Sequence, residues 1–257
     1  MTRRILDPHG AVASVVRRVS SSVGWRVSRA PKSSFGVDPY RDMRQLSINP
    51  HSPVIIDAGA NVGQTVHRLK ALFPSSRIHS FEPSPTTYAQ LCDNVRKYAG
   101  VHTSAAGLGS MQGEAQLLEN SHSDMSSFLP LGPLAWGDVA MTTTVPIDTV
   151  DDYCERAGIT AIDILKTDTQ GFDLEVVKGA ARLMASHQLH MVYMEVIFGA
   201  IYEGLPPADE VLHYMFEQGF RLVCFYEFHF QENLASWSDA LFIDPSFAKA
   251  HAVSLQP

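Results

Sequence analysis

Two acidic residues, Asp57 and Glu82, stand 25 residues apart; Asp57 ends an apolar run and Glu82 ends a second strand-like run. A glycine-rich turn containing Gly59 and Gly63 comes directly after Asp57. In nucleotide-binding βαβ units, the first strand leads into such a turn, and an acid at the end of the second strand binds a ribose. The two segments therefore predict a binding site for a nucleoside cofactor.

The spacing of the two glycines favours one type of cofactor. A dinucleotide fingerprint, G-x-G-x-x-G, lets the backbone contact a pyrophosphate, but here Asn61 lies midway between Gly59 and Gly63. S-adenosylmethionine has no phosphate, its cationic end suits Asp57, and Glu82 can accept hydrogen bonds from its ribose. The alternative is that both glycines only shape a turn in another α/β protein. We expect S-adenosylmethionine to be bound by Asp57, Gly59, Asn61, Gly63, Glu82, Pro83, Ser84, Ala105, Ala106 and Asp168.

Length and composition limit the number of domains. With 257 residues, 45% of them hydrophobic, the chain can bury one substantial core. We expect one domain at residues 51–257 after an N-terminal extension at residues 1–50. Cys92, Cys154 and Cys224 form no CxxC pair, which predicts reduced thiols. No apolar run reaches the roughly 18 residues that span a bilayer, and no signal-peptide pattern is present, so the sequence predicts a cytoplasmic protein.

Charge is distributed unevenly along the chain. Residues 1–50 hold nine Lys and Arg against three Asp, whereas the whole chain has a net charge of −7. The extension is either a solvated arm on an acidic domain or a contact for an anionic membrane or a lipid-linked substrate. Nucleic acid is an unsuitable partner for the acidic remainder, which lacks interleaved aromatic and basic residues.

Strand-like and helix-like stretches alternate from residue 54 onward. The pattern predicts a mainly parallel sheet with an antiparallel last strand and helices on both faces. Ligands of such sheets bind beyond the carboxyl ends of the strands. The expected strands are 54–58, 77–81, 101–106, 162–165, 190–196, 221–228 and 240–243, with short extra strands at 114–118 and 143–147. The expected helices are 62–72, 84–98, 149–157, 173–185 and 208–218.

Several motifs follow one another in the order of a known family. They are residues 56–63 (IDAGANVG), 81–83 (FEP), 145–152 (VPIDTVDD), 165–173 (LKTDTQGFD) and 177–180 (VKGA). Together they resemble the FkbM family of S-adenosylmethionine-dependent methyltransferases over about residues 50–244. The resemblance implies an α/β, Rossmann-like class I methyltransferase fold with a mainly parallel seven-stranded sheet.

The same resemblance implies an O-methyltransferase that acts on a hydroxyl group of a sugar, a glycolipid or another natural product. The expected partner is therefore a small-molecule or glycolipid acceptor with a free hydroxyl. One position departs from the family pattern, because many members carry Glu where this chain has Gln170. The neutral amide removes one candidate base or metal ligand.

Three acids are expected to meet at one edge of the sheet. In the strand order that the resemblance implies, Asp168 ends the fourth strand, Glu195 ends the fifth, and Asp239 begins the antiparallel last strand beside it. Asp168 can act as a general base, the cluster can hold Mg²⁺ that binds a sugar diol, or the acids can simply hydrogen-bond the backbone and the cofactor. Lys166 shares a strand face with Asp168 and can pair with an acid there.

Other side chains offer further chemistry. His122, in a serine-bearing loop, is a second candidate base, whereas His190, His213 and His229 are expected elsewhere: at the opposite edge, on a helix and in a turn. Ser126 and Ser127 can hydrogen-bond ligands, and Tyr202 and Glu203 can line the acceptor pocket. Two other functions stay open: an NAD-dependent sugar-modifying enzyme, whose glycine pattern is absent, and a non-catalytic binding protein with a methyltransferase fold.

Overall fold

The computed structural model describes residues 35–248. The chain divides into two compact units, and all described residues belong to the larger one, Phe35–Pro257. Most of the predicted basic extension lies outside the described residues, so its boundary at residue 50 and its proposed membrane contact stay predictions. Among the described residues, no helix combines the length and the apolar character needed to cross a bilayer.

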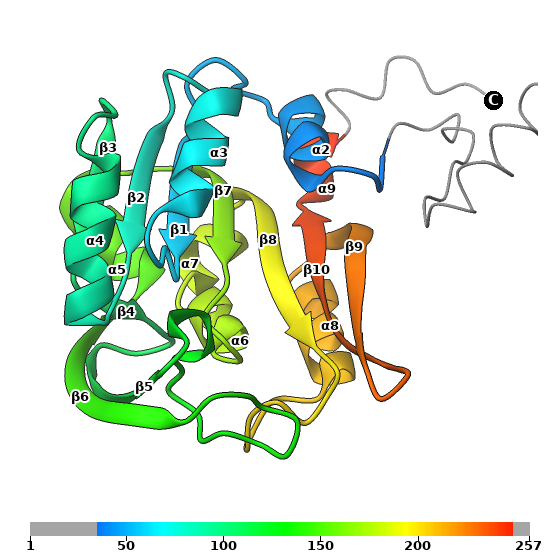
Figure 1. Ribbon diagram of the computed structural model, residues 1–257. Helices are drawn as coiled ribbons and strands as arrows, with labels where there is room; N and C mark the ends of the chain where they lie inside the picture. The colour runs from blue at the N-terminus through cyan, green and yellow to red at the C-terminus, as the bar shows by residue number, and fades with distance from the viewer. Residues whose placement is uncertain (1–34, 249–257) are drawn as a thin grey trace, which may run out of the picture. The chain divides into compact units, whose positions relative to one another are not determined.

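A seven-stranded sheet forms the centre of the described unit, with strand order β3-β2-β1-β7-β8-β10-β9 (Figure 1). Strand β10 runs antiparallel to both of its neighbours, β8 and β9, and the other pairs are parallel. This arrangement confirms the predicted fold. The strands are β1 (Val54–Ala58), β2 (Arg77–Phe81), β3 (Val101–Ser104), β7 (Ile162–Thr167), β8 (Leu189–Ile197), β9 (Arg221–Gln231) and β10 (Leu234–Ile243).

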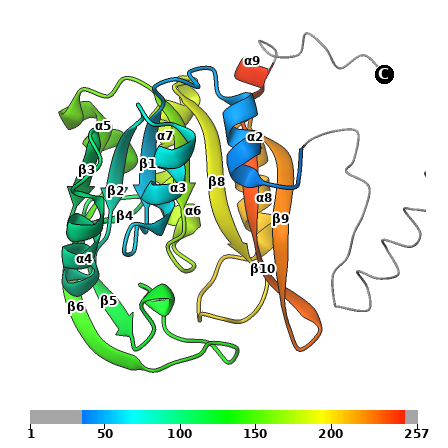
Figure 2. The same cartoon turned by 45° about the horizontal axis from the view of Figure 1, so that its top comes forward.

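Helices cover both faces of this sheet. One core lies under α2 (Pro39–Leu46), α3 (Gln64–Leu72) and α4 (Pro85–Val95), and Figure 2 shows α2 beside α3. The other core lies under α5 (Val150–Ala157), α6 (Asp173–Lys178), α7 (Ala181–Ala185) and α8 (Ala208–Glu217). Strands β1 and β7 are buried along their whole length, as expected of central parallel strands covered on both faces.

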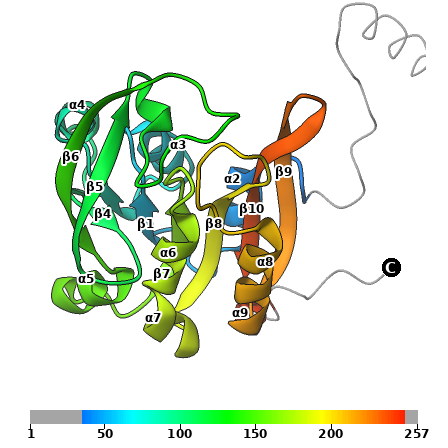
Figure 3. The same ribbon diagram turned by 90° about the horizontal axis from the view of Figure 1, so that it is seen from below.

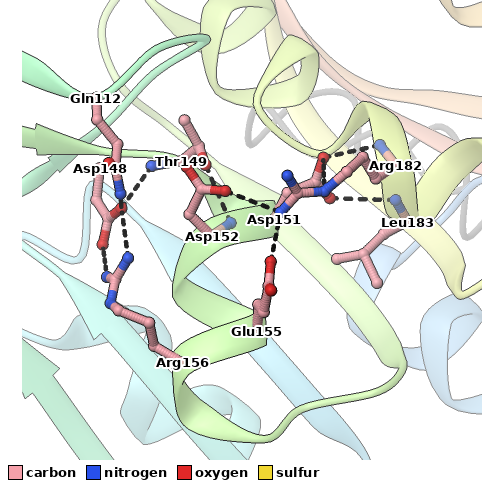
Figure 4. Close-up of polar contacts among 9 residues, drawn as sticks. All are labelled: Gln112, Asp148, Thr149, Asp151, Asp152, Glu155, Arg156, Arg182 and Leu183. Carbon is pink, nitrogen blue, oxygen red and sulfur yellow. Dashed lines mark hydrogen bonds and ion pairs between the residues drawn. The ribbon is translucent and has the colours of Figure 1, made fainter.

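Local sequence signals determine where several helices begin. Helix α4 starts at Pro85, and the side chain of Ser84 accepts a hydrogen bond from the backbone N–H of Thr87. Helix α7 has no local cap, but the Asp151 carboxylate on α5 accepts hydrogen bonds from the backbone N–H groups of Arg182 (2.7 Å) and Leu183 (3.1 Å) (Figure 4). The start of α7 is thus stabilised by a residue about 30 positions earlier in the chain.

A smaller sheet with the order β4-β6-β5 accompanies the large one. It contains β4 (Gly107–Leu108), β5 (Gly113–Asn120) and β6 (Val139–Asp148), which confirms the two predicted extra strands. Figure 3, which looks onto the end of the large sheet where β1, β7 and β8 finish, shows the loop between β5 and β6 beside the segment after β8. A β-bridge between Leu131 and Tyr202 joins these two segments. A short 3-10 turn (Ser123–Met125) lies in that loop, and α9 (Pro245–Ala248) follows β10.

Three predictions about the fold are corrected. The expected helix at 173–185 is divided between α6 and α7 at Gly179, where a Cβ would lie 2.1 Å from the carbonyl oxygen of Gly109. The last two strands are longer than predicted, with the backbone turning at Glu232 and Asn233, both at positive φ. His229 therefore lies within β9 rather than in a turn, and its ring stacks on Trp237.

Candidate active site

A cavity opens beyond the carboxyl ends of β1, β2 and β7, where ligands of such sheets bind. Including its open mouth, the cavity has a volume of about 690 Å³. Its polar side is formed by Gly59, Asn61, Gln64, Glu82, Asp168, Thr169 and Gln170, and its apolar side includes Phe81, Pro83, Leu108, Leu117 and Phe128. Ser123, Asp124, Ser126 and Ser127 of the loop after β5 complete the lining.

The Glu82 carboxylate is held in place by two backbone N–H groups. Asn61 donates to Oε2 and Ser84 donates to Oε1, both at 2.9 Å. The side chain is 8% exposed, and burial raises the pKa of this carboxyl to about 7, although the two N–H donors oppose the shift. Each carboxylate oxygen retains capacity for a further hydrogen bond. Glu82 therefore fits the predicted contact with the two ribose hydroxyls of a nucleoside cofactor.

The two glycines of the turn are required by the surrounding backbone and helices. Gly59 has φ +73°, and a Cβ on it would lie 1.9 Å from the carbonyl oxygen of Asp168. Gly63 caps α3 with φ +92°, and a Cβ there would lie 2.8 Å from Val95 on α4. The end of β7 and helix α4 therefore leave no room for a side chain at either position.

A buried lysine connects two of the predicted site acids. The Nζ atom of Lys166 lies 3.3 Å from Asp57 and 3.6 Å from Asp168, and it also donates to the carbonyl oxygen of Gly59 at 3.1 Å. Burial alone lowers the pKa of this ammonium, but the two carboxylates outweigh burial and raise it. The predicted pairing of Lys166 is confirmed. Asp57 is 0% exposed and does not line this cavity, whereas its partner Lys166 lines a second cavity under α2 and α3.

Asp168 stands between two cavities. Its side chain is 42% exposed and lines both the cavity beside Glu82 and a second one under α2 and α3. Gln64 is also shared between the two. The second cavity contains side chains of both charges and is further lined by Tyr40, Thr65, Arg68, Lys166, Thr167, Tyr193 and Asp239.

The three acids predicted to meet do lie at the same edge of the sheet. Asp239 is paired with Glu195 across β10 and β8, and it accepts a hydrogen bond from the Tyr193 hydroxyl at 2.5 Å. Burial raises the pKa of Glu195 well above its ordinary value, and Asp168, Asp173 and Asp239 add to the shift. Among the described residues, Oε2 of Glu195 is buried without a hydrogen-bond partner. Glu195 lines a separate small cavity together with Asp173, whose pKa burial raises to about 6.

In the part of the chain that the structure describes, no group of three or more His, Cys, Asp or Glu side chains is arranged to hold a metal ion. The magnesium interpretation of the acid cluster thus has no ready ligand set there. Asp168 forms an ion pair with Lys166, and Asp239 accepts a hydrogen bond from Tyr193; both are contacts with side chains rather than with the backbone or cofactor that the hydrogen-bonding interpretation named, which stays a prediction.

Of the remaining residues predicted to bind the cofactor or act in catalysis, only one lines the cavity beside Glu82. Pro83 lines it, whereas Gly63, Ser84, Ala105, Ala106 and His122 are not among its lining residues. Ser84 donates a hydrogen bond to Glu119 at 2.6 Å, and the backbone of His122 donates to Asn120. Sequence reasoning missed Gln64, Leu117 and Phe128 in the first cavity and Tyr40 and Arg68 in the second. Gln64 had a visible signal, since it is the first residue of the helix after the glycine turn.

The strand order and a cavity built on a glycine turn and an acid at the end of β2 define a Rossmann-like domain for a nucleoside cofactor. The chain belongs to the FkbM methyltransferase family, because the model of the methyltransferase FkbM domain matches residues 57–222. This membership confirms the predicted family, a methyltransferase, and S-adenosylmethionine as its cofactor. It favours the methyltransferase over the NAD-dependent alternative.

Individual relatives are distant. The chain is 25% identical over 195 residues to the 2-O-methyltransferase NoeI of Sinorhizobium fredii, covering 72% of this chain and 78% of NoeI. It is 28% identical over 148 residues to Methyltransferase 1 of Beauveria bassiana, covering 51% of this chain and 59% of that protein. Among solved structures, Aeropyrum pernix fibrillarin with natively bound S-adenosyl-L-methionine has a TM-score of 0.43 and 12% identity, covering 75% of this chain and 67% of fibrillarin.

Proposed function

We propose that this protein transfers a methyl group from S-adenosylmethionine to a hydroxyl oxygen of a sugar, a glycolipid or a similar natural product. The observation that carries the proposal is the placement of two carboxylates in one cavity. Glu82 is fixed by backbone N–H groups at one side, and Asp168 stands where this cavity meets the second one. The name of the relative NoeI, a 2-O-methyltransferase, supports transfer to oxygen.

The chain's own residues would hold the cofactor as follows. Glu82 offers acceptor capacity to the ribose hydroxyls, because each of its oxygens makes only one hydrogen bond to the protein. Leu108, Leu117 and Phe128 would supply apolar contacts for the adenine ring of the cofactor. The second cavity, joined to the first at Gln64 and Asp168, provides polar groups for parts of the reactants beyond the ribose.

When bound, S-adenosylmethionine supplies a methyl group on a sulfonium: the acceptor oxygen forms a bond to the methyl carbon, the carbon–sulfur bond breaks, and its electron pair stays on sulfur. The protein must align the acceptor oxygen, and ideal alignment contributes up to roughly 7–11 kcal/mol. It must also remove the hydroxyl proton, which a positioned base assists by about 10²- to 10⁴-fold.

Among the four predicted catalytic residues, Asp168 fits the role of this base best. It lines both cavities, and the Nζ atom of Lys166 lies 3.6 Å from its carboxylate. Glu195 lines neither of the two cavities that Asp168 lines, but a separate small one. Asp239 is occupied by the Tyr193 hydroxyl, and His122 does not line the cavity.

The test is a transfer assay with methyl-labelled S-adenosylmethionine and a panel of free and lipid-linked sugars, with mass spectrometry of the products. The proposal expects methyl ethers from the wild-type protein. Asp168→Asn should bind the cofactor with nearly unchanged affinity and lose about 100-fold or more in turnover. Methyl transfer only to nitrogen, sulfur or carboxyl groups would contradict the proposal, and cofactor binding without any transfer would support the non-catalytic alternative.

A further inference from the structure

Gln170, directly after the end of β7, is held from three sides. Its backbone has φ +53°, a left-handed conformation that costs a residue other than glycine roughly 1–2 kcal/mol. The Ser127 hydroxyl donates to its carbonyl oxygen at 2.6 Å, and the Tyr202 hydroxyl donates to its Oε1 atom at 2.8 Å. Its Nε2 atom donates to Oδ1 of Asp168 at 3.0 Å. These contacts come from separate parts of the chain and keep Gln170 in an otherwise unfavourable conformation.

The direction of each hydrogen bond follows from the charge on Asp168. The Asp168 carboxylate has Lys166 3.6 Å from its Oδ2 atom, and an ionised carboxylate can only accept. The amide of Gln170 must therefore turn its N–H₂ group toward Asp168 and its oxygen toward Tyr202. Tyr202, which is 3% exposed, must then donate. Burial raises the pKa of its hydroxyl, so it remains a donor across the range in which the protein works.

A carboxylate at position 170 would not replace this amide. Two carboxyl groups at hydrogen-bond distance cannot both be ionised without strong repulsion, so they share one proton. The amide, in contrast, donates to Asp168 at any pH. The presence of Gln rather than Glu thus has a direct consequence for the charge of Asp168.

We propose that Gln170 and Tyr202 are positioning residues of this enzyme: the hydrogen-bond chain from Tyr202 through Gln170 to Asp168 orients the Asp168 carboxylate and keeps it ionised where the two cavities meet. The inference rests on the proposed role of Asp168 as the base. It deepens that role by assigning the control of its charge and orientation to two residues outside the set predicted to be catalytic.

The test is the pH dependence of Gln170→Glu relative to wild type, with both proteins saturated with S-adenosylmethionine. Below about pH 6, a protonated Glu at position 170 can still donate to Asp168, and the two proteins should have similar turnover. As the pH rises to 8, the Glu at position 170 loses the proton that it donates, and repulsion between the two carboxylates displaces Asp168, so the ratio of variant to wild-type turnover should fall at least about tenfold. Gln116→Glu, at an exposed glutamine bonded to Thr144, should give a flat ratio.

A second readout does not depend on turnover. Carbon-13 NMR of labelled aspartate carboxyls, with the Asp168 signal assigned from Asp168→Asn, should show in Gln170→Glu a second titration step above about pH 6, where the shared proton is lost, that wild type lacks. An Asp168 signal without this step together with a flat turnover ratio would overturn the inference. If wild type transfers no methyl group to any hydroxyl, the proposed function fails, and the NMR titration still decides whether Gln170 controls the charge of Asp168.

Tyr202 is tested by a double-mutant cycle with Gln170→Met and Tyr202→Phe, with thermal unfolding used to check that each variant is folded. If Tyr202 acts through Gln170, the double variant should lose no more turnover than Gln170→Met alone, and cofactor affinity should be unchanged in Tyr202→Phe. Losses of turnover that multiply in the double variant would show that Tyr202 acts independently, which contradicts the chain.

Discussion

Gly59 and Asp168 approach each other so closely that a Cβ on Gly59 would lie 1.9 Å from the carbonyl oxygen of Asp168. The turn after β1 and the end of β7 therefore cross with no room for a side chain. This contact sets the position of the glycine turn relative to the proposed base. Because Gly59 and Asp168 both line the cavity, its shape depends on the absence of a side chain at Gly59.

Gly59→Ala should cost at least about 3 kcal/mol in the free energy of unfolding, because the steric collision adds to the strain of a positive φ. Gly158→Ala is the matched control, since Gly158 has φ +66° and open space around its Cα. It should cost only about 1 kcal/mol. Urea unfolding measures both, and equal costs would show that the crossing is not tightly packed.

Glu82 should make the stability of the cofactor-free protein depend on pH. Its folded pKa of about 7 lies above the usual value of 4.5. Its stabilising contribution is therefore complete below about pH 4.5 and is lost as the pH rises through 7, by up to about 3 kcal/mol. The amide in Glu82→Gln cannot ionise, so the free energy of unfolding of this variant relative to wild type should increase from pH 5 to pH 8. Urea unfolding at both pH values measures this, and Glu114→Gln, at an exposed acid, is the control with a constant difference.

Cofactor affinity should depend on the same ionisation. An ionised Glu82 accepts hydrogen bonds from both ribose hydroxyls, whereas a protonated carboxyl uses one oxygen as a donor. We expect the affinity of wild type for S-adenosylmethionine to decrease as the pH falls below 7, and the weak residual binding of Glu82→Gln to show little change. Calorimetric titrations at pH 6 and pH 8 compare the two, and the same pH dependence in both proteins would remove Glu82 as its cause.

The remote cap of α7 predicts a difference between two adjacent acids. Asp151→Ala removes both hydrogen bonds to the start of α7 and should cost about 1–2 kcal/mol. Asp152→Ala removes a surface ion pair with Arg182 and should cost less than about 1 kcal/mol (Figure 4). Thermal unfolding distinguishes the two variants, and a larger loss for Asp152→Ala would contradict the assignment of the cap.

The strands that carry the site could be predicted from the sequence because their signals are local. β1 and β2 have the predicted bounds: in β1 an apolar run leads to Asp57 and a glycine turn, and β2 is a strand-like run followed by Glu82 and Pro83. The pairing of Lys166 with an acid followed from its spacing of two residues from Asp168. These features need no knowledge of distant parts of the chain.

Other features depend on contacts between distant residues and left no local signal. Gly179, between α6 and α7, lies against the backbone of Gly109, and the partner of Gln170 lies 32 residues away at Tyr202. The fully buried orientation of Asp57 depends on Lys166, which is 107 residues from the carbonyl of Gly59 that it also contacts. Helix α2 does have a local start signal, because Asp38 is its N-cap and Pro39 its first residue. The basic charge of this region instead led to its assignment to an N-terminal extension.

The central claim is that this cavity binds S-adenosylmethionine through Glu82. Calorimetric titration of the full-length protein with S-adenosylmethionine at pH 8, with NAD as the control ligand, tests it most directly. The account predicts micromolar binding to wild type, no binding of NAD, and a loss of at least about 100-fold in affinity for Glu82→Ala, about 3 kcal/mol for two hydrogen bonds to a charged group. Binding of equal strength to wild type and to a folded Glu82→Ala variant would contradict it.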